Sequence, residues 1–101
     1  MSVASYILEA RTVKQGPEIL IRIPRVGALA TSESVLVCMG GECRAMRVRK
    51  RTRNSVYVAL PRVYVYRCGA RPGDVLRVAV SEEDGIPVIV IEGVASGEDR
   101  G

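Results

Sequence analysis

The chain has no histidine, phenylalanine or tryptophan, and aromatic residues make up only 4% of its 101 residues. Without histidine it lacks the usual base near neutral pH, and its three cysteines fall short of the four ligands that a structural zinc site usually takes. No apolar run approaches the roughly 18 to 20 residues of a membrane span. The N-terminus also lacks the basic and apolar regions of a signal peptide. We therefore expect a cytoplasmic protein with no membrane, metal or cofactor partner.

Catalytic motifs are also missing from the sequence. It contains no glycine-rich phosphate loop, nucleophile elbow or metal-binding box. None of its aspartates is paired with another carboxylate in a recognisable motif. We therefore expect a protein that is not an enzyme.

Aliphatic residues dominate what is present. Hydrophobic residues make up 48% of the chain and consist mainly of valine, isoleucine, leucine and alanine, and β-branched residues favour strands over helices. Arginine greatly outnumbers lysine and glutamine is nearly absent, a composition that favours a heat-adapted source. The length fits one domain with a substantial core.

Two halves of the chain repeat the same order of elements. Residues 19–26 read ILIRIPRV and residues 56–63 read VYVALPRV, so each is an alternating strand that ends at a proline. The strands that follow in each half also match: Ser34–Val37 with Asp74–Arg77, and Arg44–Arg49 with Pro87–Glu92. Each half therefore reads as strand, corner, strand, turn, strand.

The connections fit an all-β fold. The pair Gly40-Gly41 favours a two-residue hairpin turn, and Pro72-Gly73 marks a turn that leads into a strand. Only Arg25–Leu29 and Arg62–Cys68 have room for a turn or two of helix.

We predict an all-β, six-stranded barrel with pseudo-twofold symmetry and minor helix. The single domain spans residues 1–93, its halves cover about 6–50 and 51–93, and 94–101 form a flexible tail.

The second half resembles the swapped-hairpin domain of AbrB/SpoVT/MazE-type DNA-binding proteins. The likeness lies in a strand ending in Leu-Pro, a connector ending in Pro72-Gly73-Asp74, and a following strand, turn and strand. Gly73-Asp74 resembles the GD box of swapped-hairpin and double-psi β-barrel domains. We expect its role to be structural, because glycine permits the turn and the aspartate carboxylate can accept backbone N–H bonds. A fused pair of such units resembles a double-psi β-barrel, and the opening YILEAR is similar to the N-terminal domains of archaeal AAA ATPases.

The sequence departs from this family at its DNA-binding arginines. The family carries them four and five residues after the proline, where this chain has Ala28 and Leu29 in one half and Val65 and Tyr66 in the other. Only Arg67, one place further on, is in a position to substitute. The resemblance therefore leaves two functions open: a DNA-binding transcriptional or chromatin-associated regulator, and a protein-binding adaptor barrel.

One strongly basic segment favours the first function. The segment Arg44–Arg53 contains six of the 15 basic residues and no acidic residue. The other nine basic residues stand against 11 acidic residues in the rest of the chain. Such a cluster suits phosphate neutralisation, and Tyr57, Tyr64 and Tyr66 are candidates for base stacking. The alternative is a solvated strand end and connector. The proposed nucleic-acid-binding residues are Arg44, Arg47, Arg49, Lys50, Arg51, Arg53 and Arg67. We expect a monomer or weak dimer whose partner is duplex DNA or a protein.

Cys38 and Cys43 flank the Gly40-Gly41 turn symmetrically. In a two-residue hairpin they form a non-hydrogen-bonded pair, in which the Cβ atoms lie close enough for a disulfide. Two reduced thiols remain the alternative, because an ordinary cytosol is reducing. Cys68 is expected to pack as a small apolar residue.

Overall fold

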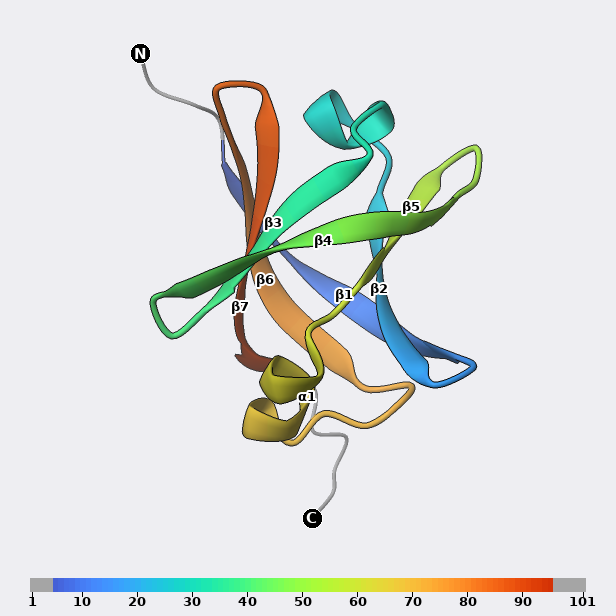
Figure 1. Ribbon diagram of the computed structural model, residues 1–101, viewed down its shortest axis with the longest axis vertical. Helices are drawn as coiled ribbons and strands as arrows, with labels where there is room; N and C mark the ends of the chain where they lie inside the picture. The colour runs from blue at the N-terminus through green and yellow to red at the C-terminus, as the bar shows by residue number, and fades with distance from the viewer. Residues whose placement is uncertain (1–4, 96–101) are drawn as a thin grey trace.

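The computed structural model describes residues 5–95. Within them the chain forms seven strands, one α-helix and one 3-10 helix (Figure 1). In chain order the elements are β1 (Tyr6–Gln15), β2 (Glu18–Pro24), η1 (Gly27–Ala30), β3 (Ser34–Met39), β4 (Glu42–Arg51), β5 (Ser55–Ala59), α1 (Arg62–Cys68), β6 (Val75–Glu83) and β7 (Ile86–Val94). No helix in this range is long and apolar enough to cross a membrane.

The strands close into a barrel in the order β1-β2-β5-β4-β3-β7-β6. β1 and β4 are ten residues each, and both change partners along their length. Residues 6–11 of β1 pair with β6 and residues 12–15 pair with β2. Residues 42–47 of β4 pair with β3 alone, whereas residues 48–51 pair with β5. The barrel therefore has two corners, at which a neighbouring strand diverges from β1 or β4.

The core follows from the period-two alternation of the strands. In β2, Ile21 and Ile23 are fully buried while Arg22 between them is exposed, and in β5 Val56 and Val58 are fully buried. These branched side chains meet valines of β3, a leucine and valines of β6, and isoleucines of β7 in one cluster. The repeated motifs of the sequence therefore supply the wall of the barrel that lies opposite β7.

The internal repeat is visible where β2 and β5 pair. Ile21 is opposite Val58, its equivalent in the repeated motif, so the two motifs pair antiparallel about a local twofold at these two residues. This symmetry does not extend around the barrel. The prediction of six strands is wrong, because β1 lies between β2 and β6 as a seventh strand.

β1 lacks a strong apolar pattern. Its inward residues include Ala10, which is small, and Thr12, which is polar but buried. Thr12 bonds to the turn before β6: its N–H donates to the Asp74 carbonyl at 2.9 Å, and its carbonyl accepts from the Gly73 N–H at 3.1 Å. The Asp74 carboxylate accepts from the Arg71 N–H at 2.9 Å. Gly73, with a φ of 95°, and Asp74 therefore shape a turn that docks on β1.

The two proline corners form the short helices expected after them. η1 and α1 follow Pro24 and Pro61, and α1 has the predicted bounds. It ends at Gly69, whose φ of 69° is the left-handed conformation that glycine accepts at a helix C-terminus. From α1, the fully buried Tyr64 ring reaches the core. Its hydroxyl donates to the Glu42 carbonyl at 2.9 Å, so α1 is joined to the β3–β4 hairpin.

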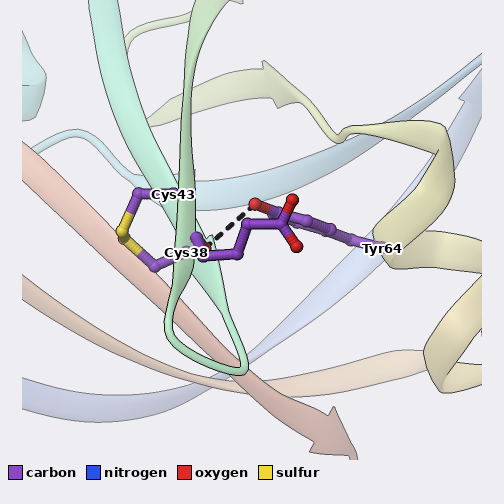
Figure 2. The surroundings of a disulfide bond; sticks show 4 residues. Cys38, Cys43 and Tyr64 are labelled. Carbon is purple, nitrogen blue, oxygen red and sulfur yellow. Dashed lines mark hydrogen bonds between the residues drawn. A yellow bond between two sulfur atoms is a disulfide. The ribbon is translucent and has the colours of Figure 1, made fainter.

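Cys38 and Cys43 are opposite each other in that hairpin, as the turn register predicts. Their Cα atoms lie 3.9 Å apart and the sulfur atoms form a disulfide. Figure 2 shows the disulfide on one side of the hairpin and Tyr64 on the other. The hairpin is therefore fixed both across its strands and against α1.

Reduction of this disulfide should have a modest effect on stability. The two cysteines are five positions apart, and the chain-entropy relation for so short a loop gives about 2 kcal/mol. We expect chemical denaturation to show a loss of about this size in dithiothreitol, with an unchanged far-ultraviolet circular dichroism spectrum. Cys38→Ser with Cys43→Ser should reproduce the loss and remove the response to dithiothreitol. Unfolding of the barrel on reduction would contradict a merely supporting role.

Candidate nucleic-acid interface

The outer surface of β2, β5 and β4 carries a row of three polar side chains. Arg22 on β2 is opposite Tyr57 on β5, and Tyr57 is opposite Lys50 on β4. The Lys50 ammonium lies 5.3 Å from the centre of the Tyr57 ring, within cation–π distance. On the other side, the Arg22 Nε donates to the Ser55 hydroxyl at 3.2 Å. The Lys50 ammonium and the Arg22 guanidinium are therefore both held on this outer surface.

A β-bulge explains why Lys50 points outward. The register between β4 and β5 shifts between Val48 and Lys50, so Arg49 is an extra residue on β4. Before the shift, Arg47 faces solvent and Val48 is half-buried. After it, Lys50 joins the outer surface and Arg51 is opposite the core residue Val56. Arg47, Arg49 and Lys50 are therefore all exposed within four consecutive positions.

We call Arg22, Arg47, Arg49, Lys50 and Arg53 the basic face. Arg53 is exposed in the loop that joins β4 to β5. Glu18 is the acidic residue that approaches this face, and its carboxylate is 2.8 Å from the Arg49 guanidinium. Within residues 5–95, the other four cations of the face have no ion pair within 4 Å. The face therefore keeps a strong excess of positive charge.

Arg51 does not belong to this face, contrary to its prediction as an exposed phosphate ligand. It is half-buried, and its guanidinium donates to the Ser32 carbonyl in the segment after η1. Nearby, Arg25 donates to the carbonyls of Ala30 and Thr52 at 3.1 and 3.0 Å. The two arginines thus tie the first proline corner to the β4–β5 loop, which is a structural role.

Arg51→Ser should therefore reduce stability rather than nucleic-acid affinity. A hydrogen bond from a charged donor is worth about 1.5–3 kcal/mol, and we expect a loss of that order in urea denaturation. The matched change Arg53→Ser, at an exposed site, should fall within about 0.5 kcal/mol. The reverse order of the two losses would contradict this assignment of Arg51.

Arg44 and Arg67 form a second cluster away from the basic face. Their guanidinium carbons lie 6.0 and 5.8 Å from the centre of the Tyr64 ring. Arg67 pairs with the Glu42 carboxylate at 3.0 Å, and Arg44 approaches it at 3.8 Å. Arg67 on α1 therefore stabilises the hairpin and does not extend the basic face.

The three tyrosines proposed for base stacking have different environments. Tyr64 is fully buried, so its stacking role is wrong, whereas Tyr66 is 87% exposed on α1. Tyr57 lies on the basic face but is half-buried and covered by Lys50. Alternation in ILIRIP could have identified Arg22 as an outward residue, but not that β2 lies beside β5.

Within the described residues, no group of three or more histidine, cysteine, aspartate or glutamate side chains is placed to hold a metal ion. Comparison of the chain with protein-family models, curated proteins and solved structures found no match. The fold and the site together define a small closed β-barrel with one basic outer face.

Proposed function

We propose that this protein binds nucleic acid without catalysis, by gripping the phosphate backbone with the basic face. The observation that supports the proposal most strongly is the row Arg22–Tyr57–Lys50, together with three further exposed cations on β4 and in the loop that follows it. Cations that lie close together with little competing acid neutralise phosphates and release counterions. Neighbouring strands are about 4.8 Å apart, so the row extends positive charge over roughly 10 Å.

The geometry favours backbone contact over base stacking. A base could reach the Tyr57 ring only by displacing the Lys50 ammonium, which lies above it. Tyr57 thus acts as a support that keeps Lys50 extended along the sheet. The proposed contacts are to phosphate groups, which carry no sequence information directly, and we propose duplex DNA as the ligand.

The family resemblance belongs to this proposal as well. The order of strand, proline corner, helix, strand, turn and strand in residues 55–94 supports the resemblance to one swapped-hairpin unit, and residues 18–51 have the same order. We propose that the chain is a fused and diverged pair of such units, in which the basic face replaces the arginines that the family carries after the proline.

A salt titration tests the proposed function directly. Fluorescence anisotropy with a labelled 20-base-pair duplex should show saturable binding at low salt. The logarithm of the association constant should fall linearly with the logarithm of salt concentration, by about 0.9 per phosphate contact. Duplexes of unrelated sequence should give the same slope. If no salt-sensitive binding to duplex DNA, single-stranded DNA or RNA occurs at low ionic strength, the proposal is wrong.

A further inference from the structure

A groove of about 1100 Å³ lies at the corner where β5 diverges from β4 and leads into α1. Its walls are largely aliphatic and come from the start of β2, the first half of β4, the second proline corner and α1. The apolar side chains that line it include Ile19, Met46, Leu60, Val63 and Val65. The groove is separate from the basic face, with which it shares none of its lining residues.

One wall of this groove is an unpaired edge of β4. Among the described residues, no strand pairs with the side of residues 42–47 that faces away from β3. Val48 donates its N–H to the Glu33 carbonyl, toward β3. Main-chain groups alternate in direction along a strand, so those of Cys43 and Ala45 point away from β3. A free edge of this kind is a template for another strand.

The charges around the groove have one predominant sign. Arg44 and Arg62 line it, and Arg62 has no ion pair within the described residues. The lining carboxylate, Glu18, is already paired with Arg49 at 2.8 Å. At the rim, the side chain of Tyr66 is 87% exposed. A ligand that complements the groove therefore has apolar side chains in the part that enters the groove and carboxylates on either side of that part.

We propose that this groove binds an extended acidic peptide of a partner protein, which adds to the free edge of β4 as an extra strand. Its main chain bonds to Cys43 and Ala45, alternate apolar side chains fill the aliphatic groove, and carboxylates at the flanks of this apolar segment face Arg44 and Arg62. A second copy of β4 is a poorer occupant, because Arg44 and Arg47 of the two copies would approach each other as like charges. The proposal is independent of phosphate binding.

The probe for this site is a fluorescein-labelled decapeptide with alternating valine and serine at its centre and two glutamates at each end. We expect saturable anisotropy with the protein, and affinity at least tenfold lower for the same decapeptide with lysine in place of glutamate. N-methylation of every second residue, which removes the main-chain donors on one edge, should abolish binding. Failure of the first peptide to bind at millimolar concentration, or equal binding of the N-methylated peptide, overturns the proposal.

Ala45→Pro provides the matched change in the protein. Proline removes the N–H that points into the groove, and edge strands tolerate proline there because no ladder hydrogen bond is lost. We expect the circular dichroism spectrum to be retained and peptide affinity to fall at least tenfold, with duplex DNA binding unchanged. Unchanged peptide affinity overturns the proposal. So does a protein dimer in sedimentation that Ala45→Pro abolishes, since the edge would then belong to a second copy.

Discussion

Replacing Arg22, Arg47, Lys50 and Arg53 together with serine is expected to reduce affinity for duplex DNA at least a hundredfold near 0.1 M salt. These four cations are exposed, lie on the basic face and have no ion pair within residues 5–95. If each contacts one phosphate, the slope of the logarithm of affinity against the logarithm of salt should flatten by about 3.6. Anisotropy titrations at several salt concentrations measure both effects.

A second quadruple variant separates position from net charge. Lys14, Arg62, Arg71 and Arg77 are also exposed but lie outside the basic face, and their replacement with serine removes the same total charge. This control should weaken binding far less. Surface changes usually alter stability by no more than about 0.5 kcal/mol, so both variants should stay folded. Equal losses of affinity would mean that overall charge, rather than the basic face, attracts the DNA.

Tyr64→Ala is expected to cause the largest loss of stability, about 3–5 kcal/mol. The side chain is fully buried in the core, and truncation of large aromatic residues leaves a cavity in addition to the lost burial. It also removes the contact between α1 and the β3–β4 hairpin. Since domains of this size are stable by only about 5–15 kcal/mol, urea denaturation should show a greatly lowered midpoint.

Tyr64→Phe is the control that isolates the hydroxyl. It keeps the ring in the core and loses the hydrogen bond to the Glu42 carbonyl, which should cost about 1 kcal/mol. If Tyr64→Phe lowered stability as much as Tyr64→Ala, the hydroxyl rather than the packed ring would be the main contribution of Tyr64 to the free energy of unfolding.

The sequence predicts the strands that alternate strongly and the turns that glycine or proline defines. β2 and β5 follow from ILIRIP and VYVALP, and Cys38 opposite Cys43 follows from the Gly40-Gly41 turn. α1 occupies Arg62–Cys68, one of the two segments in which the sequence leaves room for a turn or two of helix, although its β-branched residues disfavour helix. These features depend on residues close together in the chain.

Features that depend on pairing between strands far apart in the chain could not be predicted from the local sequence in the same way. The bulge at Arg49 leaves no trace in residues 49–53, because every residue there is polar and either register keeps the alternation plausible. The opposite directions of Lys50 and Arg51 were therefore not predictable. β1 was missed because its inward positions include Ala10 and Thr12, which are small or polar, and its identity as a strand depends on β6 and β2.

The placement of β1 and β3 has a consequence for the order in which the molecule can fold. Tyr6 at the start of β1 pairs with Val80, and Leu36 of β3 pairs in parallel with Val88. The pairings β1–β6 and β3–β7, which close the barrel, are therefore both made by the last two strands to be synthesised. Chains dominated by such distant pairings fold slowly, in roughly milliseconds to seconds. During translation the first five strands must wait, with apolar surface uncovered, until β6 and β7 emerge.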